Sequence, residues 1–197
     1  MDYDIIIIGA GLYGLTVANL AKAEGMKPLI LEKGNHIGGL CYTSKFEGCD
    51  VHEYGCHIFH TSMAHVWNFV NQFTEFNNFI NMPIAFSKGK AYNLPINLNT
   101  MNEIFGTRTP EEAQKVFNNE KGKYSYIKDP KNLEEQALVL MGETLYHTLV
   151  KEYTEKQWGR ECKDLPPHII KRMVVRLTYN NDYYNDKYQG IPYIGYT

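Results

Sequence analysis

The sequence predicts an α/β fold that opens with a βαβ unit and continues into an inserted helical module and part of an antiparallel sheet. Residues 5–8 are four consecutive isoleucines, which is the pattern of a strand buried on both faces. Apolar residues then recur at helical spacing as far as Gly25, and residues 28–31 form a second apolar run. This order predicts two parallel strands joined by a crossover helix.

A glycine-rich turn joins the first predicted strand to the helix. Gly9, Gly11 and Gly14 have the spacing GxGxxG, which permits a tight turn, close approach of a pyrophosphate and close helix–strand packing. Glu32 ends the second strand, 21 residues after Gly11, where a carboxylate can bind ribose hydroxyls. We therefore predict a Rossmann-like site for a dinucleotide with a free 2′-hydroxyl, such as FAD, NAD or a relative.

A second glycine pair, Gly38-Gly39, follows the acid closely. Such a pair lets the chain fold back across the same pyrophosphate, which suits a dinucleotide buried along its length. In this respect the sequence is similar to FAD-binding folds of the amine-oxidase and mutase type. The alternative is an ordinary loop that contains two glycines.

Three histidines, His52, His57 and His60, stand close together in the next stretch. A zinc site is disfavoured because no set of thiolates or carboxylates completes it at the usual spacing. A core role is the default for each histidine. The functional alternative is that residues 55–60 line a flavin ring, since Gly55 permits close backbone approach.

The middle of the chain predicts a hairpin and then helices. Two short β-type runs flank Lys88-Gly89. Residues 109–112, T-P-E-E, supply an N-cap, a proline at N1 and a capping-box acid, and residues 132–135, N-L-E-E, repeat the device. The last helix is expected to run from there into residues 152–161, E-Y-T-E-K-Q-W-G-R-E. Its apolar positions are four apart on one face: Leu133, Ala137, Met141, Leu145 and Leu149.

The end of this helix carries Tyr153, Thr154 and Trp158, with Gly159 as a stop signal. Two aromatic rings and a hydroxyl can stack on a base or sugar and hydrogen-bond a phosphate. The alternative reading is that Tyr153 and Trp158 cover the core of the helical module.

Basic residues follow at Lys171, Arg172 and Arg176, beside a β-type run. They are either a solvated edge or clamps for a diphosphate.

Composition limits the remaining functions. The chain has 197 residues, 44% of them hydrophobic, with a net charge of −2, so no overall field recruits nucleic acid. Its four cysteines lack CxxC or metal-type spacing, which fits a reducing cytosol. No apolar run reaches the roughly 20 residues of a membrane span. We expect a soluble, cytoplasmic protein that binds neither nucleic acid nor membrane.

Taken together, the motifs resemble those of the bacterial UDP-galactopyranose mutases along the whole chain. They are G-A-G-L-Y-G, E-K-G-N-H-I-G-G, Y-G-C-H-I-F-H-T, N-L-P-I-N-L-N-T, N-L-E-E-Q-A, Y-T-E-K-Q-W-G and I-I-K-R. The last four do not belong to flavoenzymes generally. Leu40 departs from the asparagine usual after the glycine pair.

The resemblance implies a set of site residues. Tyr13, Glu32, Lys33, Leu40, His57 and Ile58 match the family's FAD positions, and Gly9, Gly11, Gly14, Gly38, Gly39 and His60 complete the predicted cofactor set. The predicted substrate set is Asn81, Tyr153, Thr154, Trp158, Arg172 and Tyr183, with Arg172 and His57 given catalytic roles.

The resemblance also implies the chemistry. The family interconverts UDP-galactopyranose and UDP-galactofuranose, with reduced FAD N5 as the nucleophile at the anomeric carbon and no net redox change. A flavin-dependent oxidase or desaturase of the amine-oxidase type and a non-catalytic nucleotide-sugar-binding fragment are the alternatives. A homodimer is possible at full length.

The domain organisation expected from the resemblance has four parts. Residues 1–79 begin the FAD-binding domain, 80–98 form the hairpin of a substrate-side sheet, 99–171 form the helical module with the substrate helix and lid, and 172–197 return to the substrate-side sheet. Because only one βαβ unit is evident, we expect an N-terminal fragment that exposes apolar sheet edges, binds FAD weakly and is inactive alone.

Overall fold

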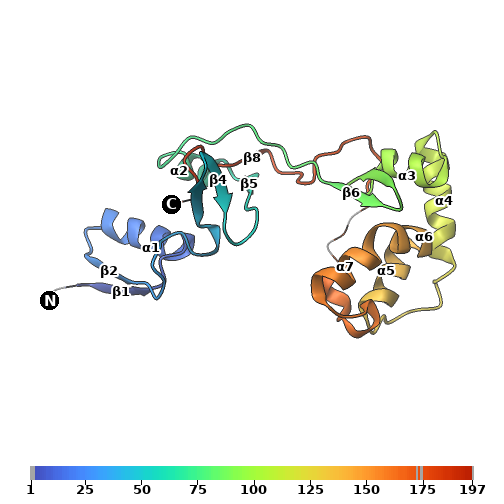
Figure 1. Cartoon of the computed structure of the whole chain (residues 1–197), viewed down its shortest axis with the longest axis horizontal. Helices are drawn as coiled ribbons and strands as arrows, with labels where there is room; N and C mark the ends of the chain where they lie inside the picture. The colour runs from blue at the N-terminus through green and yellow to red at the C-terminus, as the bar shows by residue number, and fades with distance from the viewer. Residues whose placement is uncertain (1–2, 172, 174, 197) are drawn as a thin grey trace. The chain divides into compact units, whose positions relative to one another are not determined.

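The computed structural model describes residues 3–171, 173 and 175–196. It divides into two compact units, Met1–Ile80 with Asp186–Thr197, and Asn81–Asn185 (Figure 1). Each unit is described by itself below, and the four domain boundaries expected from the sequence stay predictions. No helix in the described part of the chain is long and apolar enough to cross a membrane.

The first unit opens with the predicted βαβ arrangement. Strand β1 (Ile5–Ile8) pairs in parallel with β2 (Pro28–Leu31), and helix α1 (Leu12–Ala23) connects them. The glycine-rich turn and the helix stop near Gly25, which has φ of +81°, lie where the sequence predicts them. The Rossmann-like fold class is therefore confirmed.

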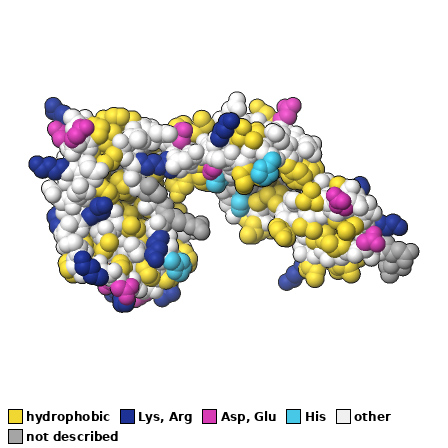
Figure 2. Space-filling model, turned by 180° about the vertical axis from the view of Figure 1, so that it is seen from behind, with side chains coloured by type: hydrophobic (Ala, Val, Ile, Leu, Met, Phe, Trp, Pro, Cys, Tyr) yellow, Lys and Arg dark blue, Asp and Glu magenta, His cyan; other side chains and the backbone are white. Residues whose placement is uncertain are grey.

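Burial of β1 on both faces was a wrong expectation. Ile7 is 8% exposed because α1 packs on its side of the sheet, but Ile6 and Ile8 are 61% and 88% exposed. Among the described residues this sheet has two strands only, and no element covers its second face. Figure 2 shows apolar side chains gathered at the surface of the unit that carries the N-terminus.

The rest of the first unit consists of short elements. A hairpin joins β3 (Thr43–Phe46) to β4 (Cys49–His52), and the short 3-10 turn η1 (Gly39–Cys41) precedes it. Strand β5 (Phe59–Thr61) pairs antiparallel with β8 (Tyr188–Gly190), and α2 (Ala64–Val70) follows β5. Residues 188–190 thus pair with β5 of the same unit.

The second unit contains that hairpin and the helical module. Strands β6 (Ile84–Ser87) and β7 (Lys90–Asn93) pair antiparallel through Lys88 and Gly89, both at positive φ, as the turn signal predicts. The longer helices are α3 (Leu98–Phe105), α4 (Pro110–Gly122), α5 (Leu133–Met141) and α7 (Lys151–Trp158). Between and after them lie α6 (Glu143–Leu145), the π-helical η2 (Tyr146–Val150), η3 (Cys162–Asp164) and η4 (Pro167–Ile169).

The predicted helix caps form. Thr109 accepts a hydrogen bond from the Glu112 amide (3.2 Å), and the Asn132 side chain accepts one from the Glu135 amide (2.9 Å). The apolar face that follows Asn132 is the main core of this unit. Leu133, Ala137, Met141 and Leu145 are 0% exposed and Leu149 is 7% exposed.

These core residues do not belong to one continuous helix, contrary to the expectation. Gly142 has φ of +81° and ψ of 171°, which ends α5. A Cβ at this position would lie 2.6 Å from Glu120 Cβ, so the chain needs glycine where it passes α4. The apolar spacing of four residues persists across the break because α6 and η2 continue the same buried side.

Replacing Asn132 by alanine should lower the free energy of unfolding by about 1 kcal/mol, because the Glu135 amide loses its acceptor. Urea denaturation followed by circular dichroism measures the loss. Asn119→Ala, on the exposed side of α4, is the matched control and should change stability by less than about 0.5 kcal/mol. Equal effects from the two substitutions would contradict the capping role.

Candidate functional site

The turn between β1 and α1 offers an anion-binding helix end. Gly9 N–H donates to Leu31 O (2.7 Å), which ties the turn to β2. The first helical bond runs from Leu15 N–H to Gly11 O, so the amides of residues 12–14 have no acceptor within the helix. Gly11 is the N-cap and supplies no side-chain cap. Free amides together with the helix dipole favour a phosphate at this point.

Two of the glycines are required by close backbone approach. A Cβ on Gly14 would lie 2.1 Å from Gly9 O and 3.3 Å from Ile7 Cγ2, so only glycine lets α1 approach β1 this closely. A Cβ on Gly39 would lie 3.0 Å from Gly11 Cα. The tight turn at Gly9 and the close helix–strand packing at Gly14 are therefore present, and the approach of a pyrophosphate at Gly11 stays a prediction.

The glycine pair does fold back across the fingerprint, as predicted. Gly38 N–H donates to Ala10 O (2.8 Å), and Gly38 forms an isolated parallel bridge with Gly11. Gly38 and Gly39 both have positive φ, at 95° and 58°. The pair is thus part of the dinucleotide turn and not an unrelated loop.

The Glu32 carboxylate closes the same turn. Oε2 accepts from Ala10 N–H (2.6 Å) and Oε1 accepts from Gly34 N–H (2.7 Å). These bonds, first the one from Ala10 and then the one from Gly34, lower the pKa of Glu32. Each oxygen keeps a lone pair, so the anchored carboxylate can still accept from ribose hydroxyls.

The stability of the chain should depend on the ionisation of Glu32. Because its folded pKa is lowered, its contribution is present above the unfolded value of 4.5 and is lost as pH falls through the folded value. Thermal unfolding of Glu32→Gln should therefore differ most from wild type near neutral pH, and the difference should shrink well below pH 4.5. Glu24→Gln, an exposed substitution at the end of α1, is the control and should change stability near neutral pH by less than about 0.5 kcal/mol. If the difference in thermal stability between Glu32→Gln and wild type did not change with pH, the stabilising role of the ionised Glu32 carboxylate would be refuted.

The remaining predicted cofactor residues lie near the turn in sequence but are less fixed by it. Tyr13 is 85% exposed on the first turn of α1, and Leu40 is 70% exposed in η1. Lys33 is exposed next to Glu32, and Ile58 is half-buried before β5. Their cofactor contacts stay predictions.

The histidines already have partners within the protein. His57 N–H donates to His52 Nδ1 (3.0 Å), and His57 Nδ1 lies 2.8 Å from Gly55 O. His60 Nδ1 lies 2.6 Å from Asp186 Oδ2. The catalytic role of His57 and the cofactor contact of His60 stay predictions.

Asp186 is a residue that the sequence analysis missed. It binds His60, which lowers the pKa of the Asp186 carboxyl, and it also accepts from Ser62 Oγ (2.9 Å). It thereby attaches the segment before β8 to β5. No local pattern marks this residue, because its partners lie more than a hundred positions earlier.

The last described residues also touch the glycine pair. A Cβ on Gly38 would lie 2.5 Å from Tyr196 O, and Tyr196 N–H donates to Thr43 Oγ1 (3.1 Å). Burial raises the pKa of Tyr196. The residues around 196 therefore support Gly38 from the side opposite the fingerprint, a contact that the sequence did not reveal.

A groove of about 870 Å³ in the same unit is a different feature. It lies between α1 and α2 and is mostly apolar, with Leu15, Val66 and Phe69 among its lining residues. None of the predicted cofactor residues lines it.

In the second unit, α7 presents two aromatic side chains to solvent. Tyr153 is 70% exposed and Trp158 is 52% exposed, so the reading that they cover the core of the module is wrong. Thr154 is 8% exposed and faces the interior instead. Gly159, at φ of +63°, ends the helix as predicted.

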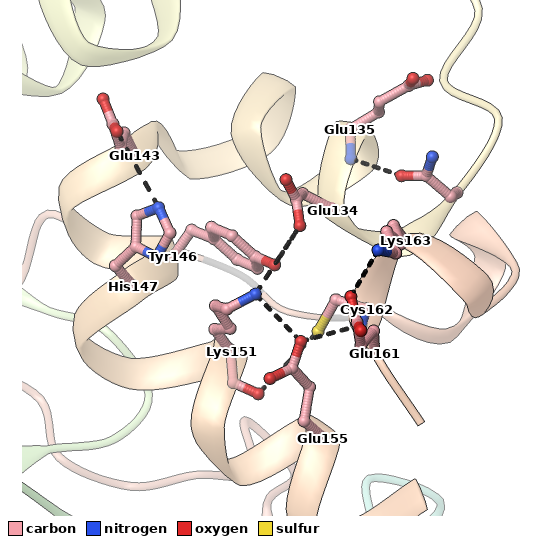
Figure 3. Close-up of polar contacts among 11 residues, drawn as sticks. Glu134, Glu135, Glu143, Tyr146, His147, Lys151, Glu155, Glu161, Cys162 and Lys163 are labelled. Atoms are coloured by element: carbon pink, nitrogen blue, oxygen red, sulfur yellow. Dashed lines mark hydrogen bonds and ion pairs between the residues drawn. The ribbon is translucent and has the colours of Figure 1, made fainter. Parts of the chain in front are cut away.

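A polar network of half-buried side chains holds α7 in place (Figure 3). Lys151 Nζ donates to Glu155 Oε1 (3.0 Å), which also accepts from the Cys162 amide (3.1 Å). Lys151 Nζ lies 3.9 Å from Glu134 Oε2, which accepts from Tyr146 OH (3.0 Å). The Cys162 amide first, and Lys151 second, lower the pKa of Glu155. This network joins α7 to α5 and η3, so it fixes the helix that carries Tyr153 and Trp158.

Other predicted substrate residues meet elsewhere in this unit. Tyr183 N–H donates to Asn81 O (2.8 Å), so these two residues, about a hundred positions apart, are neighbours. Arg172 lies outside the described residues. Arg176 binds backbone carbonyls, as described below.

Comparisons with known proteins agree with this picture. Residues 7–73 match the family model of an NAD(P)-binding Rossmann-like domain, and residues 148–197 match that of UDP-galactopyranose mutase. A dTDP-fucopyranose mutase from Escherichia coli is 44% identical over 98% of this chain and 52% of the relative. A probable UDP-galactopyranose mutase from Klebsiella pneumoniae is 43% identical over 98% of this chain and 51% of the relative.

The chain belongs to the UDP-galactopyranose mutase family. It spans about half the length of the curated relatives it matches. A crystal structure of a reduced UDP-galactopyranose mutase has the same fold, with a TM-score of 0.68 at 22% identity, over 89% of this chain and 38% of that chain. The second family match covers α7 and the segment that carries Tyr183.

Proposed function

We propose that the protein to which this chain belongs is a nucleotide-sugar pyranose mutase that uses FAD. The observation that carries the proposal is the exposed pair Tyr153 and Trp158, held on α7 within the residues that match the mutase family. Exposed aromatic rings on a fixed helix suit stacking against a nucleotide base or a sugar.

The residues of the first unit fit a dinucleotide. The free amides of α1 would bind an anion, a Cβ on Gly39 would lie only 3.0 Å from Gly11 Cα, and Glu32 is anchored with acceptor capacity left. The glycine pair that returns to the fingerprint favours FAD over NAD. When bound and reduced, FAD supplies a nucleophilic N5 for the anomeric carbon, so that the sugar isomerises with no net redox change.

The side chains of the second unit would bind and orient the substrate. Tyr153 would stack on the base, and Trp158 would contact the diphosphate and sugar. Thr154, at 8% exposure, faces the interior and is left out of these contacts, contrary to the expectation from the sequence. Asn81, Tyr183 and Arg172 complete the proposed substrate set, with Arg172 holding the diphosphate as its negative charge increases.

Two substrates follow from the relatives. UDP-galactopyranose is the substrate that the family match favours, and the Escherichia coli relative supports dTDP-fucopyranose as the second candidate. Incubation of the reduced whole protein with each furanose, without an electron acceptor, distinguishes them by the pyranose that forms. Turnover only with an added acceptor would instead indicate an oxidase.

Nucleotide binding by the 197-residue chain tests the role of α7 directly. Tyr153→Ala and Trp158→Ala should each weaken UDP binding, measured by calorimetry, by about 5- to 150-fold, the equivalent of the 1–3 kcal/mol of a base stack. Tyr126→Ala is the matched control, since Tyr126 is equally exposed at 72% in the same unit. If Tyr126→Ala weakened UDP binding as much as the other two substitutions do, the assignment of Tyr153 and Trp158 to the nucleotide site would be rejected.

A further inference from the structure

The Arg176 side chain binds the protein backbone. Its Nη1 donates to Asp182 O (2.6 Å) and its Nη2 donates to Tyr183 O (2.9 Å). The backbone amide of Arg176 donates to Ile96 O (2.8 Å), which fixes the backbone from which the side chain extends. Two consecutive carbonyls therefore accept from two of the five guanidinium N–H groups, which ties the Arg176 side chain to the backbone of residues 182–183. The reading of Arg176 as a diphosphate clamp or a solvated edge stays a prediction.

Arg176 binds the carbonyls at the end of a loop, and further hydrogen bonds hold the beginning of the same loop. Asn97, 0% exposed at the N-cap of α3, donates to Asn180 O (3.0 Å) and to Asn181 Oδ1 (2.7 Å). Asn99 donates to the same Asn181 oxygen (3.0 Å). Residues 178–183 thus form a loop whose two ends are hydrogen-bonded to other residues of the second unit, the unit that also contains Asn81.

The consequence of this loop is the placement of Tyr183. Its amide reaches Asn81 O at 2.8 Å, and its side chain is 44% exposed. Fixing the backbone of one residue costs about 1–2 kcal/mol, and a site that is fixed before binding does not incur that cost when the ligand arrives. The planar guanidinium offers coplanar N–H groups that can hold adjacent carbonyls, whereas the lysine ammonium is a single nitrogen on a flexible stem, so lysine is not an equivalent replacement.

We propose that Arg176 is a positioning residue for the nucleotide-sugar site, because its grip on the carbonyls of Asp182 and Tyr183 holds Tyr183 beside Asn81 before the ligand binds. The inference rests on the proposed function in one respect, namely that Tyr183 contacts the nucleotide sugar. It adds that Arg176 acts through Tyr183 and not on the diphosphate.

A double-mutant cycle on UDP binding tests this path. Arg176→Lys should weaken UDP binding roughly tenfold in the wild-type background, but less than about twofold when Tyr183 is already alanine. Arg108→Lys, an exposed arginine before α4, is the control and should leave the affinity unchanged. Equal losses in both backgrounds would show that Arg176 acts independently of Tyr183 and would overturn the inference alone.

A measurement on the protein without ligand tests the inference independently of the proposed function. Hydrogen exchange of the Tyr183 amide should accelerate at least tenfold in Arg176→Lys, while the amides of α4 keep their wild-type rates. Unchanged exchange at Tyr183 would overturn the inference whatever UDP does. If wild type binds neither UDP nor dTDP, both the inference and the proposed function fail.

A second variant covers the case in which Arg176→Lys does not fold. Asn181→Ala removes the acceptor shared by Asn97 and Asn99 at the opposite end of the loop. It should show the same loss of UDP binding that disappears in the Tyr183→Ala background. If Asn181→Ala weakened UDP binding equally in the wild-type and Tyr183→Ala backgrounds, the inference would be overturned in the same way.

Discussion

Replacing Gly14 by alanine is expected to weaken FAD binding by at least about tenfold, the equivalent of 1.4 kcal/mol. The new Cβ would lie 2.1 Å from Gly9 O, a backbone atom in the turn itself, so either α1 or the turn must move. Any such movement displaces the helix amides that face the pyrophosphate. Alanine gains about 1 kcal/mol of helix propensity over glycine, which cannot offset a clash of this size.

Titration of the 197-residue chain with FAD, followed by flavin fluorescence, measures the effect. Gly122→Ala is the matched control, since a Cβ there meets no atom within 4 Å at the end of α4. That control should bind FAD as wild type does and be as stable or slightly more stable. Wild-type affinity in Gly14→Ala would mean that the fingerprint turn does not bind the cofactor.

Features decided by a few adjacent residues could be predicted from the sequence. The glycine fingerprint, the Lys88-Gly89 turn and the caps at Thr109 and Asn132 all depend on local backbone chemistry, and the structure contains each of them. The exposure of Tyr153 and Trp158 on α7 does not follow from the sequence, because spacing on a helix does not say which side the rest of the unit covers.

Features decided by distant contacts could not be predicted. The apolar spacing continues through Gly142 and predicts an unbroken helix there, whereas the break follows from the close approach of Glu120. The pairing of β5 with β8 and the bond from Asp186 to His60 join residues more than a hundred positions apart. The two exposed isoleucines of β1 follow from which elements cover the sheet, a property that a run of four isoleucines does not contain.

The buried row that crosses the Gly142 break should matter most for stability. Leu145 is 0% exposed in α6 and belongs to the core cluster that also includes Leu133 and Met141. Leu145→Ala should lower the free energy of unfolding by about 2–5 kcal/mol, because the removed atoms leave a cavity that a well-packed core fills only in part.

A leucine-to-alanine substitution at an exposed position shows how much of the stability loss is due to burial and how much to the change of side chain itself. Leu20 is 51% exposed on α1, so Leu20→Ala should cost less than about 1 kcal/mol. Urea denaturation of both variants, with circular dichroism as the signal, gives the comparison. If Leu145→Ala cost no more than Leu20→Ala, the segment after Gly142 would not be part of the core, and the support for Tyr153 and Trp158 on α7 would have to come from the Lys151–Glu155 network alone.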